Sequence, residues 1–347
     1  MKTPEPTLSA SRTPFEGTGQ SPQPEQPRPH RRPRDLAASL FAHYGVIIAF
    51  LVVILIFSLL QPGVFPTWRN ARSILQNVAA SMIIAVGLTV VLAMQDFDLS
   101  FGAMIGLAGG GAVSLMALHQ VPWPVAIVTV IAIGALAGCI NGFVITVLGG
   151  SSFIITLAMG TILTGFEYVF TSEQTIFQGV AHGYASIGST TFLGLNNQVW
   201  IALIVVVVLW TLLDATEMGR YMYAIGGNPD AARLSGIRVR LLRTSGFVCV
   251  GVVAAVVGIL LTSEASSYTP NSGIPYLLPA YAGCFLGAAC FRPGEFNVPG
   301  TVIGVLFLGT VATGLTMVNL QTSIINLVDG TILIVAVLLS RLGARSA

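Results

Sequence analysis

Side chains that could perform chemistry are few and scattered in this 347-residue chain. Four histidines stand far apart, at His30, His43, His119 and His182. Covalent catalysis needs a nucleophile beside its base, and a metal site needs clustered ligands. Neither pattern occurs, and the four cysteines lack metal-ligand spacing. The sequence therefore predicts no catalytic residues, no bound cofactor and no metal.

Lysine is nearly absent, since Lys2 is its single occurrence. A Gly-x-x-x-x-Gly-Lys-Ser/Thr loop needs a lysine to reach the phosphates of a nucleotide. The chain cannot hydrolyse ATP by that route. It also shows no basic stripe of the kind that binds nucleic acid, so we expect no such partner.

A few polar residues stand inside or beside apolar runs and could line a pathway or gate. Asp98 and Ser100 open such a run, where the alternative is that they cap helix amides. Asn141 must face another helix or the pathway, because lipid cannot satisfy its amide. Glu167 is expected to reach the membrane interface. Asn271 lies in a Pro-Asn-Ser-Gly stretch that could line an entrance or form a structural turn.

The elements that position these residues must be membrane helices. Hydrophobic residues make up 54% of the chain and charged residues 9%, with a mean hydropathy of +0.82, whereas soluble domains are about 25% charged. We predict an all-α polytopic membrane protein in which 1–35 is a disordered cytoplasmic tail and 36–347 is the transmembrane domain. At about twenty residues per crossing, ten spans follow: 44–60, 74–94, 98–118, 123–147, 153–171, 198–214, 241–262, 275–291, 299–318 and 322–340.

Two features of this arrangement bear on mechanism. Only residues 95–98 separate the second and third spans, which could instead form a broken, partly re-entrant unit. Ten spans with a polar loop after the sixth hint at two inverted five-helix halves, although no sequence repeat accompanies them. Glycine-rich stretches such as 134–138 are expected to pack helices closely.

The polar loop 215–240 contains one short predicted helix. Asn228 can cap it, Pro229 suits its first position, and Asp230 faces the positive end of its dipole. Ala232 and Arg233 continue it. Gly236 can close it in the left-handed conformation, giving about two turns. Residues three and four apart, Ala231, Leu234 and Ser235, offer a smooth face, so this is either an ordinary loop helix or one that docks on a partner.

Charge distribution predicts the orientation of the chain. Five arginines lie in and around this loop: Arg220, Arg233, Arg238, Arg240 and Arg243. The connection 172–197 contains neither Lys nor Arg. Because translocation disfavours positive charge, the loop and both termini are predicted to be cytoplasmic.

The stretch from Tyr223 to Ile237, YAIGGNPDAARLSGI, resembles the cytoplasmic coupling loop of ribose/xylose-type permeases of bacterial ABC importers. Weaker similarity runs from about 75 to 339. It includes Asp98 to Gly102 (DLSFG), Asn141-Gly142 and Phe153 to Thr156 (FIIT). By this resemblance Phe153 joins Asp98, Ser100, Asn141 and Asn271 as a candidate pathway or gate residue. The family usually has two glycines where this chain has Gln95 and Asp96, and often a basic residue at Asp329.

This resemblance implies an inner-membrane permease that carries a sugar or related small polar solute. A periplasmic or lipid-anchored binding protein would deliver the solute, and a separate ATPase subunit would bind ATP and seat on the coupling loop. A second permease, identical or different, would complete the pathway. Two alternatives remain: an ion-coupled secondary transporter, and a membrane protein that has lost transport.

Overall fold

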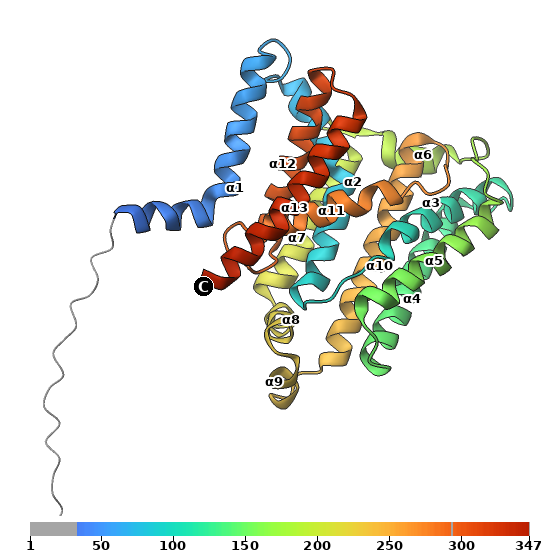
Figure 1. The fold of residues 1–347 in the computed structure, drawn as a ribbon. Helices are drawn as coiled ribbons and strands as arrows, with labels where there is room; N and C mark the ends of the chain where they lie inside the picture. The colour runs from blue at the N-terminus through green and yellow to red at the C-terminus, as the bar shows by residue number, and fades with distance from the viewer. Residues whose placement is uncertain (1–32, 293, 347) are drawn as a thin grey trace, which may run out of the picture. The chain divides into compact units, whose positions relative to one another are not determined.

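The computed structural model describes residues 33–292 and 294–346, with side chains for 45–292, 294–321, 323–325, 327–328 and 330–338. Helices dominate the described part of the chain (Figure 1). They are α1 (Pro33–Leu60), α2 (Trp68–Ala93), α3 (Phe101–Ala117), α4 (Trp123–Val147), α5 (Ser152–Thr171), α6 (His182–Ser189), α7 (Asn197–Trp210), α8 (Glu217–Gly227), α9 (Pro229–Leu234), α10 (Val239–Ala265), α11 (Leu277–Gly287), α12 (Val298–Met317) and α13 (Thr322–Ser346).

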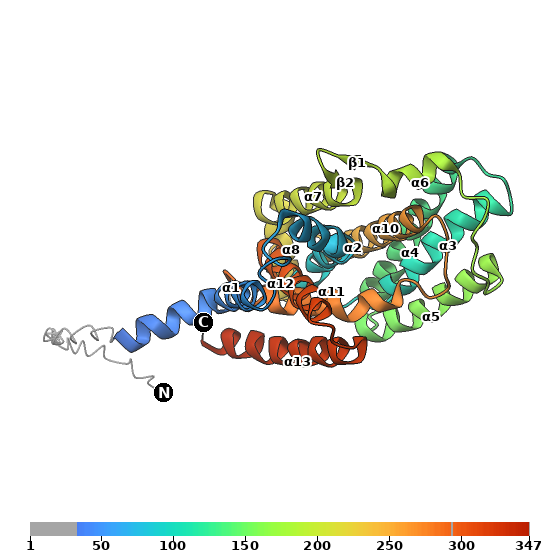
Figure 2. The ribbon, with the colours of Figure 1, turned by 90° about the horizontal axis from the view of Figure 1, so that it is seen from above.

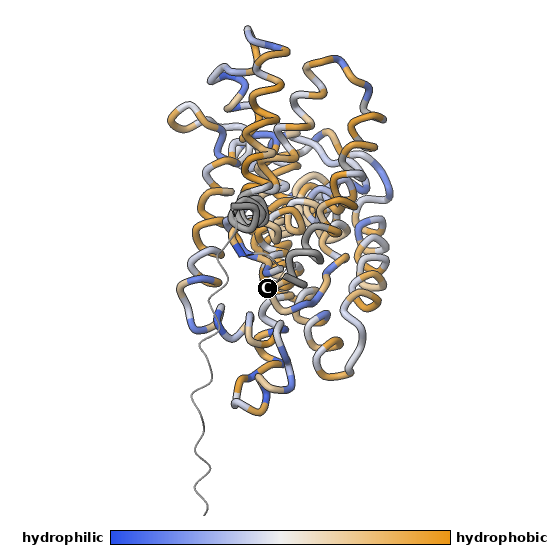
Figure 3. The backbone as a smooth tube through the Cα atoms, turned by 60° about the vertical axis from the view of Figure 1, so that its left-hand side comes forward, coloured by the Kyte–Doolittle hydropathy of each residue, from blue (hydrophilic) through white to orange (hydrophobic). Residues whose placement is uncertain are grey.

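Most of the predicted spans coincide with these helices. Six described helical segments are long and apolar enough to cross a membrane: α2, α4, α5, α7 with its π-helical extension Thr211–Ala215, α10 and α12. Four shorter apolar segments accompany them, at Gly45–Leu60, Phe101–Ala117, Ile274–Gly287 and Ser323–Leu338. Figure 3 shows apolar residues along most helices and polar ones gathered in the connections. The fold is therefore that of a polytopic helical membrane protein.

Several predicted boundaries were wrong. Helix α1 already begins at Pro33, within the predicted tail, because proline suits the first helical position; residues 1–32 lie outside the described part. Helix α2 starts six residues early, at Trp68, where the Thr67 hydroxyl caps it by accepting from the Asn70 amide.

Two predicted spans are shorter than expected. Helix α3 has 17 residues and α11 has 11, or roughly 26 and 17 Å at 1.5 Å per residue. The chain leaves α2 at Gln95 in a left-handed conformation (φ 61°), and residues 94–100 are not helical. This supports the broken arrangement of the second and third spans.

The predicted all-α class also needs one small correction. The connection 172–197 contains helix α6 and a two-residue antiparallel hairpin, β1 (Thr191–Phe192) with β2 (Leu195–Asn196). Leu193 and Gly194 both have positive φ, as a tight hairpin turn requires. The Tyr184 hydroxyl hydrogen-bonds to the Thr262 hydroxyl of α10 at 2.6 Å, which holds α6 on the bundle.

Helix α10 is the centre of the described bundle. It contacts α3 and α4 on one side and α2 on the other, and α2 in turn contacts α11 and α12 (Figure 2). Glycines allow the closest approaches: a Cβ on Gly138 of α4 would lie within van der Waals overlap of the Phe247 carbonyl of α10. Gly134 and Gly251 face each other in the same way. The packing role predicted for 134–138 is confirmed.

We expect Gly138→Leu to lower the melting temperature of the detergent-purified chain, because the new side chain would collide with backbone. Overpacking generally costs about 1–3 kcal/mol. Scanning fluorimetry would measure the loss. Gly165→Leu on α5 is the matched control, since nothing lies within 4 Å of its Cβ position. Equal losses in the two variants would contradict the close α4–α10 contact.

Candidate functional site

The loop 215–240 forms the predicted short helix. Asn228 takes an extended conformation, and its Oδ1 accepts from the amides of Asp230 and Ala231, both at 3.0 Å. Pro229 occupies the first helical position, and Gly236 ends the turn with φ of 84°. The helix predicted from capping residues, α9, is therefore present with the expected boundaries.

One side of α9 is attached to the bundle and the other is bare. Ala232 is buried, whereas Ala231, Arg233 and Ser235 are exposed. Leu234 is 90% exposed, which is unusual for a large apolar side chain. Beside it, a hollow of about 570 Å³ opens between α8 and α10. A small apolar face next to a hollow has the form of a docking element.

Helix α8 supports α9 and connects it to α2. Its Met222 and Ile225 are buried. A Cβ on Gly226 would overlap the Ala93 carbonyl at the end of α2, so only glycine allows this contact. The Tyr223 hydroxyl donates to the Phe296 carbonyl at 2.9 Å. Burial, reinforced by the Asp214 carboxylate, raises the pKa of Tyr223 to about 12, so the phenol stays protonated as a donor.

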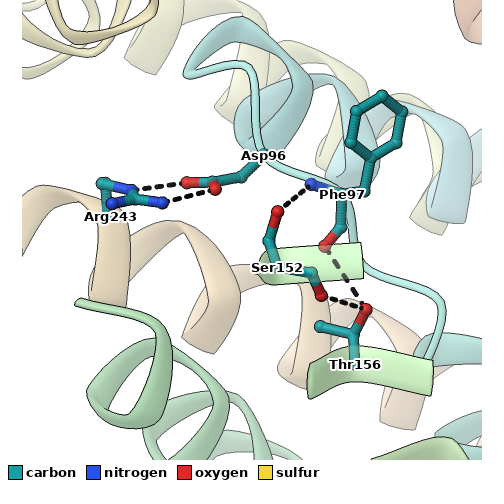
Figure 4. A network of polar contacts seen from close by, with 5 residues as sticks. All are labelled: Asp96, Phe97, Ser152, Thr156 and Arg243. Carbon is teal, nitrogen blue, oxygen red and sulfur yellow. Dashed lines mark hydrogen bonds and ion pairs between the residues drawn. The ribbon is translucent and has the colours of Figure 1, made fainter. Parts of the chain in front are cut away.

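An ion pair joins the start of α10 to the α2–α3 link, which we define as residues 94–100. Arg243 donates from Nε to Asp96 Oδ2 and from one terminal nitrogen to Oδ1, both at 2.6 Å (Figure 4). The Asp96 side chain is 4% exposed and that of Arg243 is 25% exposed. Such fork-like pairs are strong and geometrically specific. The two residues stand 147 positions apart.

Every backbone amide of the α2–α3 link is hydrogen-bonded within the protein. Met94, Gln95 and Asp96 donate their amides to carbonyls of α2. The Phe97 amide donates to Ser152 Oγ, as Figure 4 shows, and the Leu99 amide donates to Thr156 Oγ1. The Asp98 amide donates to the Tyr281 hydroxyl at 3.1 Å, and that hydroxyl donates to the Asp98 carbonyl at 2.6 Å. Helices α5, α10 and α11 thus hold this irregular segment.

Three of the predicted pathway residues form one buried chain. Asp98 Oδ1 accepts from the amide and hydroxyl of Ser100, at 2.8 and 2.6 Å. The Asn141 amide donates to Ser100 Oγ at 2.9 Å. All three side chains are at least 96% buried. Asp98 accepts from the Ser100 amide at the start of α3, but the Ser100 side chain caps no helix amide. The interhelical bond considered for Asn141 is present, and a pathway role stays a prediction.

The other two predicted residues lie apart from this chain. Phe153 is 52% exposed at the start of α5. Asn271 sits in the α10–α11 connection and hydrogen-bonds to the Tyr168 hydroxyl. The structure thus brings Asp98, Ser100 and Asn141 together and leaves Phe153 and Asn271 outside their network. The side chain of Asp329 lies outside the described residues.

Glu167 was predicted to reach the interface, and this was wrong. It is 1% exposed and lies against Gly106 of α3, where there is no side chain. Its Oε1 accepts from the Tyr268 hydroxyl at 2.5 Å and from the Asn271 amide at 2.9 Å. A buried carboxylate needs such donors. Glu167 therefore ties the α10–α11 connection to α5.

Sequence reasoning missed Arg243, Tyr268 and Tyr281 as partners of the link and of Glu167. Arg243 was counted only as one of the cytoplasmic arginines. The available signal was the pair of acidic residues, Asp96 and Glu167, at the edge of or within apolar runs, because each needs a donor elsewhere in the chain.

Together these features define a polytopic helical membrane protein that carries one short capped helix outside its apolar bundle. Residues 70–337 match a family model described as a branched-chain amino acid transport system permease component. The chain belongs to this transport permease family, and within it to the ribose-type sugar permeases of bacterial ABC importers.

Three relatives illustrate the relationship. The chain is 34% identical to the ribose import permease RbsC of Haemophilus influenzae, over 84% of this chain and 90% of the relative. It is 35% identical to RbsC of Bacillus subtilis, over 86% and 92%. It is 30% identical to the D-allose transport permease AlsC of Escherichia coli, over 86% and 91%. The relatives are permease proteins, which places this chain in the inner membrane as a multi-pass component.

We expect Asp96→Asn to lower the melting temperature of the purified chain, because it leaves the Arg243 guanidinium without its carboxylate. Breaking a buried pair on one side costs about 3–5 kcal/mol, and the loss here should be smaller because Arg243 is partly exposed. Scanning fluorimetry would measure it.

Glu217→Gln serves as the control for this variant. It removes the carboxylate of the exposed Glu217–Arg220 pair at 3.8 Å, where such pairs contribute little. The reciprocal variant with Asp96→Arg and Arg243→Asp should recover part of the stability lost in Asp96→Asn. Similar melting temperatures for Asp96→Asn and Glu217→Gln would exclude an anchoring role for the pair.

Proposed function

We propose that this chain is the membrane-spanning subunit of an ABC importer for a sugar or related small polar solute. A binding protein, periplasmic or lipid-anchored, delivers the solute. A separate ATPase subunit binds ATP and seats on α9, and a second permease subunit completes the pathway. The observation that carries the proposal is the capped, exposed helix α9 with its bare Leu234. Relatives that import ribose or transport D-allose and L-arabinose support the solute class.

The proposed topology has ten spans in two inverted five-helix halves, with both termini and α9 in the cytoplasm. The six long and four shorter apolar segments fit ten crossings. The segment 215–240 has four arginines and the connection 172–197 has none, which supports an inner position for the former.

Two contacts offer a route from α9 to the pathway. Helix α8 meets α2 where Gly226 lies on the Ala93 carbonyl. Helix α10, which follows α9, is joined to the α2–α3 link by the ion pair between Arg243 and Asp96. A displacement of α9 by ATPase closure would therefore reach the α2 end of the link through two contacts, at Ala93 and at Asp96. A short capped helix suits this task, because transmission needs rigidity and a shaped face but no reactive group.

In this mechanism the link acts as part of the gate. Asp98, Ser100 and Asn141 hold its shape within the bundle. Phe153 and Asn271 lie in other segments, at the start of α5 and in the α10–α11 connection, and we assign them to the two entrances. Alternating access would then consist of two arrangements of the link relative to α5, α10 and α11.

We expect Leu234→Glu and Ala231→Glu to abolish ATPase-driven uptake while the chain still inserts in the membrane. A charge on this face would be buried without a partner when the ATPase docks. Co-purification with a candidate ABC ATPase, and uptake in proteoliposomes, would measure the effect. Leu193→Glu in the β-hairpin is the matched control, because Leu193 is likewise an exposed leucine, with 75% of its surface accessible. Normal uptake by Leu234→Glu would overturn the role of α9.

The same proteoliposomes separate this proposal from an ion-coupled transporter. An ABC importer takes up solute when ATP and the binding protein are supplied and is unaffected by a proton or sodium gradient. Uptake by the purified chain alone under an ion gradient would contradict the proposal.

Orientation can be tested by cysteine labelling. Thr191 and Ser235 are both exposed, and the proposed topology puts them on opposite sides of the membrane. We expect a membrane-impermeant maleimide to label Thr191→Cys in spheroplasts, and Ser235→Cys only after lysis. The unmodified chain supplies the background from its own cysteines. The reverse pattern would contradict a cytoplasmic α9.

A further inference from the structure

A groove lined by both apolar and polar side chains lies between α2, α11 and α12. Its volume is about 460 Å³, within the range of small-molecule sites. Three of its lining residues, Ser73, Asn77 and Ser81, repeat every four positions along α2 and so share one face. Thr313 and Thr316 of α12 also line it. No sequence pattern singled out these residues.

The polar side chains of the groove lack protein partners, unlike others on the same helix. In the described part of the chain, the side chains of Ser73, Asn77, Ser81 and Thr313 make no hydrogen bond. By contrast, Thr89, deeper on α2, bonds to the Ala85 carbonyl and to a threonine of α12. An amide and hydroxyls facing lipid would be unsatisfied. Ser73 and Asn77 are exposed in the groove, so their polar groups can bind water or a polar molecule there.

The chemistry of the lining selects the class of that molecule. Among the residues whose side chains the structure describes, the groove is lined by hydroxyls, one amide and apolar side chains such as Val78, Leu308 and Met317, and by no ionisable group. A zwitterionic amino acid would need charged partners when it leaves water. A neutral polyhydroxylated solute needs donors and acceptors for its hydroxyls and apolar contact for its carbon-bound hydrogens. The lining supplies both.

The groove is also connected to the proposed coupling route. One wall of the groove is formed where α2 packs on α12. There the Val78 side chain fills the position that a Cβ on Gly309 would take. At the other end of α2, Gly226 of α8 lies against the Ala93 carbonyl. Just beyond that end, Arg243 of α10 binds Asp96 of the α2–α3 link. Helix α2 thus spans from the groove to the elements beside α9, so a shift of α2 against α12 would change the groove.

We propose that this groove binds the solute during its passage, and that the solute is a neutral polyhydroxylated molecule held by Asn77, Ser81 and Thr313. The inference rests on the proposed function and adds the site at which the solute binds. Hydrogen bonds contribute about 0.5–1.5 kcal/mol each. Removing one should therefore lower uptake roughly two- to tenfold, since 1.4 kcal/mol is tenfold.

Uptake in proteoliposomes is the first test. The full chain is assembled with a candidate ABC ATPase and a candidate binding protein and supplied with radiolabelled D-ribose, D-allose, L-arabinose or L-leucine. Asn77→Leu and Thr313→Val should each lower uptake of the transported sugar two- to tenfold, and together by more, while the ATPase still co-purifies. Thr161→Val on α5 is the matched control, because its hydroxyl is exposed and makes only a 3.4 Å bond to its own helix.

The outcomes separate the two proposals. No uptake of any solute by the unaltered complex would overturn the proposed function itself. Sugar uptake that is unchanged in Asn77→Leu and Thr313→Val would overturn the groove alone. Uptake of L-leucine in place of the sugars would overturn the solute class.

Cysteine labelling tests the groove without a functional assay. Ser73→Cys, Asn77→Cys and Ser81→Cys should react with a hydrophilic maleimide at least tenfold faster than Val128→Cys and Leu136→Cys, whose apolar side chains are exposed on α4. The transported sugar should slow the labelling of Asn77→Cys. Equal rates at all five positions, or disulfide-linked dimers through Ser73→Cys and Ser81→Cys in place of labelling, would overturn the proposal and assign this face to lipid or to a second permease.

Discussion

Irregular backbone inside an apolar helical bundle must find all of its hydrogen bonds within the protein, because lipid supplies none. The α2–α3 link satisfies this requirement amide by amide, with α2 carbonyls, Ser152, Thr156, Tyr281 and Asp98 as acceptors. Its partners belong to α2, α5 and α11, and Arg243 adds α10. These helices cannot move independently of the link, so the link is the natural place for two alternative arrangements of the bundle.

Close packing through glycine gives the bundle its other constraint. Gly134 and Gly138 of α4 lie on the backbone of α10, and Gly226 of α8 lies on the end of α2. Contacts of this kind transmit displacement well, because backbone against backbone leaves no flexible side chain to absorb it. The chain of helix contacts that leads from α9 through α8 and α10 to α2 and the α2–α3 link is consequently stiff.

Polar groups divide into two kinds on this basis. Those with protein partners, such as Asp96, Asp98 and Glu167, fix one helix or connection to another. Those without partners, along the α2 face of Ser73, Asn77 and Ser81, border a cavity. A transport protein needs both kinds. If every polar group in its interior were hydrogen-bonded within the protein, none could bind a solute, and if none were hydrogen-bonded, the chain would not fold.

The sequence alone determined what depends on neighbouring residues. Apolar run length predicted α4 and α12 nearly to the residue, and capping chemistry predicted α9 from Asn228 to Gly236. It could not determine which distant groups meet: the Arg243 partner of Asp96, the burial of Glu167 against Gly106, or the groove between α2 and α12. Caps and spans are set by hydrogen bonds and hydropathy within a few residues. Ion pairs and cavities depend on how helices far apart in the chain are placed, and only the tertiary structure decided that.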